Sequence, residues 1–125
     1  LAETIIKDNP SIKKMRFCVS GTEATMYASR LARAFTQRKL VAKARLGWHG
    51  ANDTLSYDVG NLIGHKFPPG LVDAEKAGII SFEINNEDTF DMIKQNADNL
   101  AAIILEPVLG GGGGFPVEHN FLKRL

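Results

Sequence analysis

Apolar and polar positions along the chain form blocks that predict alternating strands and helices. Four short apolar runs are rich in strand-forming side chains and predict buried strands: residues 15–19, 40–44, 78–84 and 101–105. Helical spacing or flanking turn residues favour helices at residues 1–8, 22–37, 51–57 and 86–97, with a further helix that begins near Glu118. Residues 58–76 fit neither period and contain Pro68 and Pro69, so we expect a long surface loop there.

The longest predicted helix, over residues 22–37, is amphipathic. Its apolar positions share one stripe, made of Ala24, Ala28, Leu31, Ala32 and Phe35. Glu23, Arg30, Arg33 and Gln37 lie largely outside this stripe. Strands that alternate with helices imply a mostly parallel sheet with helices on both faces. We therefore predict an α/β fold in which residues 1–125 belong to one domain.

Composition and charge narrow the possible functions. The net charge is +1, and the basic cluster of Lys13, Lys14 and Arg16 is too small for a nucleic-acid footprint. No apolar stretch approaches the roughly 18 residues that span a membrane. The single cysteine, Cys18, excludes an internal disulfide and suits a reducing compartment, so we expect a cytoplasmic protein. The histidines lack the spacing of metal ligands, and we predict no metal site.

Polar or aromatic side chains follow three of the predicted strands. Residues 20–22 follow the first strand, residues 48–50 follow the second, and Glu106 ends the fourth. In a parallel α/β sheet, ligands bind beyond the carboxyl ends of the strands. This shared placement predicts a ligand site at that edge of the sheet.

The start of the helix after Ser20 carries two possible roles. Unpaired N–H groups at a helix start attract anions, and Gly21 lets a phosphate come close to the backbone, with hydroxyl groups on either side in Ser20 and Thr22. The alternative is a capping box, in which Ser20 caps the helix and Glu23 reaches back. The two roles can coexist, because a phosphate can use donors that the cap leaves free.

The other two positions also leave alternatives open. Trp48 is the only tryptophan of the chain and lies in a glycine-flanked turn, where its ring could stack on a planar heterocycle or anchor the loop by packing. His49 could donate a hydrogen bond or pack. Glu106 should emerge at the sheet edge, and the glycine run at residues 110–114 is either a close backbone approach to a ligand or a flexible loop.

Taken together, these segments resemble the class III aminotransferases, and among them glutamate-1-semialdehyde aminomutases and their near relatives. Residues 17–24 read F-C-V-S-G-T-E-A and are similar to the family's F-x-N-S-G-[TS]-E-A. Residues 31–36, L-A-R-A-F-T, resemble L-A-R-x-[YF]-T, and residues 47–50, G-W-H-G, resemble G-[YFW]-H-G. Residues 104–108, I-L-E-P-V, resemble the strand that ends in E-P-[VIM]. Order and spacing agree across nearly the whole chain.

The resemblance implies a cofactor, pyridoxal 5'-phosphate (PLP), and roles for the matching positions. Ser20, Gly21 and Thr22 would hold its phosphate. Trp48 would stack on the pyridine ring, with His49 beside it, and Glu106 would lie near the active site. The fold implied is part of the three-layer αβα large domain of fold-type I PLP enzymes, which work as homodimers.

The resemblance also implies what lies outside these residues. The family's aspartate that pairs with the pyridine nitrogen and its Schiff-base lysine are expected downstream, and none of the chain's lysines matches the lysine context. We therefore expect the chain to be part of a longer protein, truncated at both ends, with no catalytic residue of its own and no activity alone.

The sequence is compatible with three functions. The first is that of an aminomutase, an isomerase that moves an amino group between adjacent carbons of an amino acid or amino aldehyde. The second is that of a transaminase acting on a β- or ω-amino compound, because residues 109–111 read L-G-G where aminomutases tend to have A-G-N. The third is that of a non-catalytic phosphate-binding or structural domain.

Overall fold

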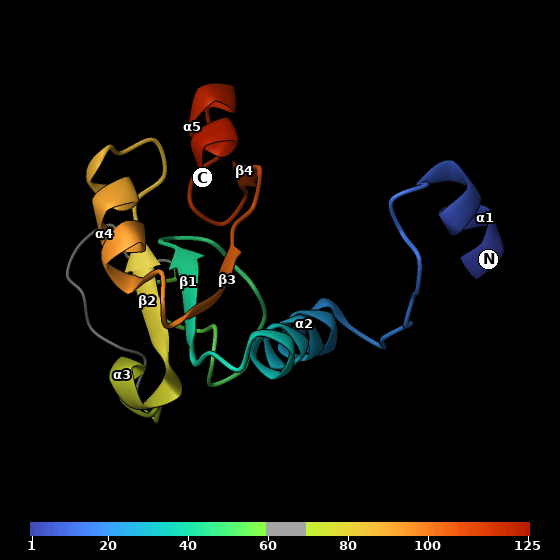
Figure 1. Ribbon diagram of the computed structural model, residues 1–125, viewed down its shortest axis with the longest axis horizontal. Coiled ribbons are helices and arrows are strands. Elements are labelled where there is room, and N and C mark those ends of the chain that lie inside the picture. The colour runs from blue at the N-terminus through green and yellow to red at the C-terminus, as the bar shows by residue number, and fades with distance from the viewer. Residues whose placement is uncertain (60–69) are drawn as a thin grey trace.

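The computed structural model describes residues 1–59 and 70–125 and confirms an α/β fold with a parallel sheet. Strands β1 (Leu40–Ala44), β2 (Ile79–Phe82) and β3 (Leu100–Ile104) pair in parallel in the order β2-β1-β3 (Figure 1). The helices are α1 (Ala2–Asp8), α2 (Gly21–Thr36), α3 (Ala74–Ala77), α4 (Asp88–Asn96) and α5 (His119–Arg124). The predicted residues 48–50 follow the carboxyl end of β1, the central strand.

Side chains of β1 alternate between the two faces of the sheet, as a strand dictates. Ala42 and Ala44 belong to one apolar cluster, which includes Phe90 of α4 and Phe121 of α5. Val41 belongs to a second cluster on the other face, with Leu55, Tyr57 and Ile79. The central strand is therefore covered on both faces, which explains why residues 40–44 read as a nearly continuous apolar run.

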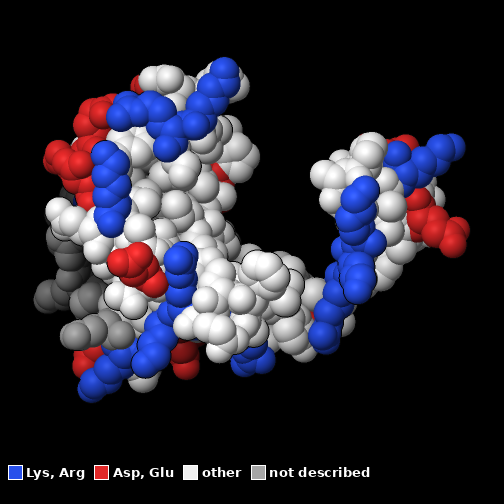
Figure 2. All heavy atoms as spheres, viewed as in Figure 1, with Lys and Arg blue, Asp and Glu red and all other residues white. Residues whose placement is uncertain are grey.

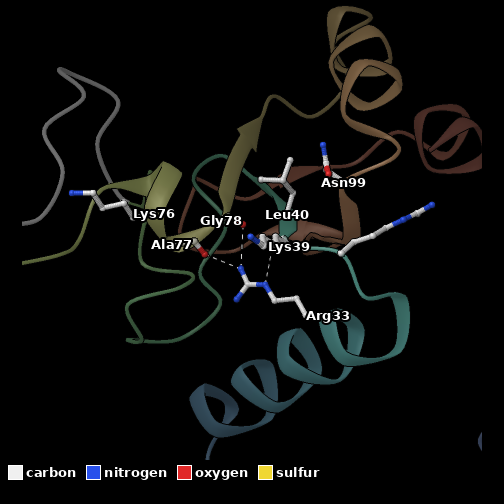
Figure 3. A pocket seen from close by; sticks show the side chains of 8 residues that line it. Arg33, Lys39, Leu40, Lys76, Ala77, Gly78 and Asn99 are labelled. Carbon is white, nitrogen blue, oxygen red and sulfur yellow. Dashed lines mark hydrogen bonds between the residues drawn. The ribbon is translucent and has the colours of Figure 1, made fainter.

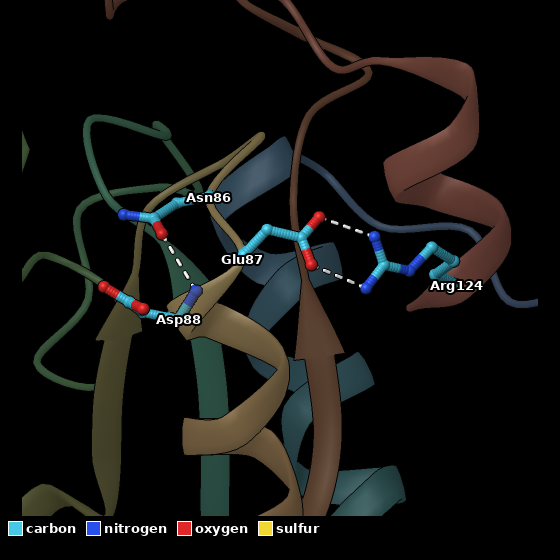
Figure 4. Close-up of polar contacts among 4 residues, drawn as sticks. All are labelled: Asn86, Glu87, Asp88 and Arg124. Carbon is cyan, nitrogen blue, oxygen red and sulfur yellow. Dashed lines mark hydrogen bonds and ion pairs between the residues drawn. The ribbon is translucent and has the colours of Figure 1, made fainter.

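Contacts at the start of α4 join it to α5. The Arg124 guanidinium donates to both carboxylate oxygens of Glu87, with Nη2 at 2.7 Å from Oε2 (Figure 4). This hydrogen bond with Arg124 lowers the pKa of the Glu87 carboxyl. Arg124 also lies over the ring of Phe90, which packs against Phe121 with ring centroids 5.1 Å apart. The first residue of the helix is held by Asn86, whose Oδ1 accepts from the Asp88 N–H.

The predicted strand at residues 15–19 is wrong. This segment is irregular, and the side chains of Phe17 and Val19 are 59% and 96% exposed. A strand needs a neighbour that completes its hydrogen bonds, and the sheet formed by the described residues does not reach this segment. The segment instead joins the body to α1, which buries none of its residues and projects away from the sheet (Figure 1).

The predicted helix at residues 51–57 is also wrong, because the segment forms turns. The Asn52 Oδ1 accepts from the N–H groups of Thr54 and Leu55, a side-chain contact that competes with helical hydrogen bonds. The predicted surface loop at residues 58–76 lies partly outside the described residues, which exclude residues 60–69. The last residues of the predicted loop belong to helix α3.

The glycine run forms a turn that the sequence analysis did not predict. Strands β4 (Val108–Leu109) and β5 (Phe115–Pro116) pair antiparallel on either side of it. Gly113 and Gly114 adopt positive φ angles of 104° and 76°, which side chains disfavour. The run is therefore the connection of a short hairpin.

Helix α2 confirms the prediction for residues 22–37 within one residue at each end, but its apolar stripe does not face the sheet. Leu31 and Phe35 are 70% and 87% exposed. Figure 2 shows that white, uncharged atoms cover much of the α2 surface in this view. The polar side is turned inward instead, where Ser29 is buried and Thr25 and Arg33 donate to backbone carbonyls of other segments.

No helix among the described residues has the length and apolar character needed to cross a bilayer.

Candidate cofactor site

The predicted ligand residues converge at the carboxyl end of β1, although the segment before α2 is not a strand. A cavity of about 240 Å³ opens there, lined by Gly21, Thr22, Thr25, Trp48, His49 and Gly50. Ser20 flanks this cavity at the start of α2, and Glu106 approaches the loop from the end of β3. The site therefore combines a helix start with the loop that follows the central strand.

The start of α2 forms the predicted cap and leaves two backbone N–H groups free. Ser20 caps the helix, because its Oγ accepts from the Glu23 N–H at 3.2 Å. The Glu23 carboxylate reaches back to the Val19 N–H at 2.8 Å, one residue before the usual position of a capping box. The N–H groups of Gly21 and Thr22 have no acceptor among the described residues. Since an added Cβ at Gly21 would meet nothing within 4 Å, an anion has room to reach these donors.

Glycine at position 50 lets the loop lie directly against α2. Gly50 has a φ of 97°, and a Cβ there would lie 2.6 Å from the Cα of Thr22. The Thr25 hydroxyl donates to the His49 carbonyl at 2.6 Å, and the Ala51 N–H donates to the Thr22 Oγ1 at 3.3 Å. Helix and loop are thus fixed to each other by a close backbone approach and two hydrogen bonds.

Thr25 was not among the predicted site residues. Its sequence signal is its position one turn after Gly21, which places it on the same side of the helix as the free N–H groups.

Both oxygens of the Glu106 carboxylate are engaged by backbone. Oε1 accepts from the Trp48 N–H at 2.6 Å, and Oε2 accepts from the Gly110 N–H at 3.1 Å. Glu106 therefore ties the loop after β1 to the segment after β3. The Trp48 side chain remains 54% exposed, so a face of its indole is available to a ligand.

A buried lysine underlies this loop and was missed by the sequence analysis. Lys43 is fully buried, and its ammonium donates to the Tyr57 carbonyl. Burial lowers the pKa of Lys43 to about 8, and the charges of Asp58 and Glu106 oppose this shift. A lysine within the apolar run at residues 40–44 was the available signal, because such a charge in a buried strand requires partners.

His49 is buried and shifted toward its neutral form. Burial is the main cause of its lowered pKa; the nearby charge of Lys43 adds to it, and Glu106 opposes it. The His49 Nε2 atom is buried without a hydrogen-bond partner among the described residues. This atom lies against Gly47, where an added Cβ would come within 2.8 Å of it. No group of three or more potential metal ligands occurs in the described part of the chain.

Comparisons with known proteins identify the family of this chain. The family model for aminotransferase class III matches residues 1–125. The glutamate-1-semialdehyde 2,1-aminomutase of Ignicoccus hospitalis is 40% identical over 129 residues, covering 100% of this chain and 30% of that protein. The chain thus spans about 30% of the length of the curated relatives it matches.

Solved structures agree with the sequence comparison. A transaminase with PLP bound superposes with a TM-score of 0.87 at 32% identity, over 99% of this chain and 30% of that one. An omega-transaminase from Sphaerobacter thermophilus gives a TM-score of 0.86 at 32% identity, over 98% and 30%. Together with the match of the family model to the whole chain, these similarities show that the chain belongs to the class III aminotransferase family.

Proposed function

We propose that this chain supplies the phosphate-binding corner and one ring-stacking face of a PLP site in an enzyme that transfers amino groups. The observation that carries this proposal is the pair of free N–H groups at Gly21 and Thr22, which share a cavity with Trp48 and His49. A helix start with unpaired donors suits a doubly charged phosphate ester. The half-exposed indole suits a planar ring.

Each predicted residue has a defined part in this proposal. Gly21 and Thr22 donate backbone N–H groups to the phosphate, and the Ser20 and Thr22 hydroxyls add donors at its edge. Trp48 stacks on the ring, and His49 lies beside it in the wall of the same cavity. Glu106 holds the Trp48 backbone in place, so it acts as a positioning residue.

When bound, PLP supplies an electron sink for a carbanion next to the substrate nitrogen. The residues of this chain bind and orient that group. His49 is poised neutral beside it, because burial and the Lys43 ammonium disfavour a second positive charge. A neutral imidazole can accept or donate one hydrogen bond without repelling a cationic amine.

For the whole protein we infer the activity of a glutamate-1-semialdehyde 2,1-aminomutase, as the curated relatives are named. The substrate would be a small amino aldehyde or amino acid, and the protein would work as a cytoplasmic homodimer. Residues 1–125 would form part of the PLP-binding domain, with the covalently bound lysine outside them. A transaminase acting on an ω- or β-amino compound is the second candidate, favoured by the L-G-G sequence at residues 109–111 and by the names of the similar structures.

The site assignment is tested by filling the space at the helix start. Gly21→Leu adds a side chain where nothing lies within 4 Å, so the fold should tolerate it while the phosphate loses its place. We expect at least about a tenfold weaker PLP affinity, measured by absorbance titration of the whole protein. Ala24→Leu, an exposed position on the same helix, is the matched control. Equal affinities in both variants would dismiss the phosphate assignment.

Stacking by Trp48 has its own test. Trp48→Ala should weaken PLP binding by about 1 kcal/mol or more if the indole covers the ring. Unchanged affinity would leave Trp48 as a residue that only packs in its loop.

The activity is tested with glutamate-1-semialdehyde as the only substrate. An aminomutase converts it without an added amino acceptor, whereas a transaminase needs a second substrate. Turnover that depends on an added keto acid would favour the transaminase. A protein without any turnover, and without a lysine that bonds PLP, would favour the non-catalytic alternative.

A further inference from the structure

A second cavity lies at the opposite end of the sheet from the cofactor site. It has a volume of about 480 Å³, and its wall includes residues that directly precede or begin the three strands: Leu40 of β1, Gly78 before β2 and Asn99 before β3. Figure 3 shows the Arg33 side chain of α2 reaching the backbone at this amino-terminal edge. The cavity shares no lining residue with the cofactor site.

Four cations line this cavity: Arg33, Arg38, Lys39 and Lys76. The net charge of the whole chain is only +1, so the gathering is local and does not reflect a basic protein. None of the described residues that line the cavity is acidic. Asp73 pairs with Lys76 at 3.0 Å from outside the lining, but both side chains are about three-quarters exposed. An exposed pair of this kind is worth little and can exchange for a bound anion.

Arg33 is built into the wall. Its Nε donates to the Lys39 carbonyl at 2.8 Å, and its Nη2 donates to the carbonyls of Ala77 at 2.9 Å and Gly78 at 3.1 Å. Gly78 permits this approach, because a Cβ there would lie 3.4 Å from the Arg33 Nη2 and 2.9 Å from the Lys39 carbonyl oxygen. Partial burial lowers the pKa of Arg33, which shows that protein replaces part of its water. An anion beside a partly dried guanidinium is attracted more strongly than in open solvent.

Donor groups remain for a ligand after these internal bonds. Arg38 uses one nitrogen, Nη1, for the Leu100 carbonyl at 3.2 Å. The Lys39 ammonium has no partner among the described residues, and Nη1 of Arg33 has none either. Arg38 keeps the Nε and Nη2 edge of its guanidinium, and Arg33 keeps Nη1. Two ammonium groups on flexible stems complete the donors for a compact anion with several charges, and the Lys76 stem, which points away from Arg33 in Figure 3, turns toward the ligand. The volume suits a small molecule, and four cations are too few for a nucleic-acid track.

We propose that this cavity, bounded by Arg33, Arg38, Lys39 and Lys76, binds a small multivalent anion such as a phosphate compound or a polycarboxylate. The site is separate from the PLP site and does not depend on its assignment. The ligand would bridge α2, the start of β1 and the end of α3, and would therefore stabilise the edge from which the central strand begins.

Isothermal titration calorimetry of the whole protein at low ionic strength tests this site, with pyrophosphate and citrate as probes and acetate as the monovalent reference. Lys39→Gln with Lys76→Gln removes two cations whose side chains support no other element. Lys7→Gln with Lys123→Gln removes the same charge from α1 and α5, which do not line the cavity. Circular dichroism checks that both double variants keep the wild-type fold.

We expect binding of at least one multivalent probe, weakened about tenfold or more by the first pair and unchanged by the second. The tighter of the two probes assigns the ligand to phosphates or to carboxylates. Absence of heat with both probes up to roughly 10 mM would overturn the proposal. Equal binding in wild type and both double variants would overturn it as well, because the anion would then lie elsewhere, for example at the start of α2. An equal loss of probe binding in both double variants would also overturn the proposal, because the loss would then follow from the overall charge of the protein.

Discussion

The backbone N–H of Trp48 donates to the Glu106 carboxylate at 2.6 Å, although the two residues lie 58 positions apart. The second oxygen of the same carboxylate accepts from Gly110 at 3.1 Å. One side chain thus links the loop after the central strand to the segment that follows its neighbour β3. This link holds the backbone of Trp48, while its indole is half-exposed.

Glu106→Gln should weaken cofactor binding without unfolding the protein. A glutamine amide can still accept from the Trp48 N–H through its oxygen, but its NH₂ group cannot accept from Gly110. We expect a loss of up to about 1.5–3 kcal/mol in PLP affinity, the range for a hydrogen bond to a charged group. The measurement is a PLP titration, with Glu118→Gln, an exposed carboxylate outside the cavity, as control. An effect of the same size in the control would remove the positioning role from Glu106.

Gly50→Ala should separate the loop from α2. The added Cβ would lie 2.6 Å from the Thr22 Cα, and the backbone there cannot move without breaking the Thr25 contact to His49. We expect a loss of about 2 kcal/mol or more in the free energy of unfolding, because overpacking and a strained φ add. Urea unfolding measures it.

The control for Gly50 isolates the steric clash from the backbone angle. Gly70 has a φ of 93°, close to the 97° of Gly50, but a Cβ there would meet nothing within 4 Å. Gly70→Ala should therefore cost only the strain of a positive φ. If the two variants were equally destabilised, the close approach of loop and helix would make no contribution to the free energy of unfolding.

The buried Lys43 should make stability depend on pH. Its folded pKa of about 8 lies below the ordinary value of 10.5, so the charged form is disfavoured by folding and the full penalty is present below pH 8. Folding releases the proton between these two values, and the free energy of unfolding should rise with pH in that window. From the shift we expect a rise of about 2 kcal/mol between about pH 7 and about pH 9.5.

Lys43→Met isolates this contribution. The variant keeps a side chain of similar length but has no titrating group, so its unfolding free energy should lack that rise. Tyr57, whose pKa burial raises, titrates in both proteins and cancels in the comparison. The difference between the two urea-unfolding curves as a function of pH is the measurement. Parallel curves for the wild type and the variant would mean that Lys43 stays charged when folded.

Arg33→Met should destabilise the amino-terminal edge of the sheet. The carbonyls of Lys39 and Ala77 lose the Arg33 donor, whereas the Gly78 carbonyl keeps the Val41 N–H at 2.9 Å; a methionine keeps much of the apolar stem. We expect a loss of about 2 kcal/mol or more in unfolding free energy, because carbonyls left without a partner are costly. Arg30→Met on the exposed side of the same helix is the control and should change stability by less than about 0.5 kcal/mol. Similar losses in both variants would show that helix propensity, and not the carbonyl contacts, sets the effect.

The local signals of the sequence predicted much of the fold and of the site. Continuous apolar runs identified β1, β2 and β3, because strands covered on both faces need apolar side chains throughout. Ser20 marked the start of α2 correctly, since its hydroxyl caps the helix. The predicted residues after the strands did converge, with Gly21, Thr22, Trp48 and His49 around one cavity. Their roles toward PLP remain predictions.

Other features could not be inferred because they depend on distant partners. Residues 15–19 carry strand-forming side chains, but no neighbouring strand of the described chain completes their hydrogen bonds. Residues 51–57 do not form the predicted helix, because the Asn52 Oδ1 accepts hydrogen bonds from the backbone N–H groups two and three residues ahead. The periodicity of apolar residues does not reveal whether a partner strand is present or whether a side chain competes for backbone hydrogen bonds.

The sequence by itself determined the alternation of β1, β2 and β3 with helices, the cap of α2 and the motifs that follow the strands, because these depend on residues close together in the chain. Only the tertiary structure decided which face of α2 turns inward. The polar side faces inward, because Thr25 and Arg33 donate hydrogen bonds to backbone carbonyls of remote segments. Leu31 and Phe35 stay exposed. It also decided that Lys43 is buried beneath the loop of Trp48, because the acceptor of its ammonium, the Tyr57 carbonyl, is brought to it by the fold and not by sequence spacing.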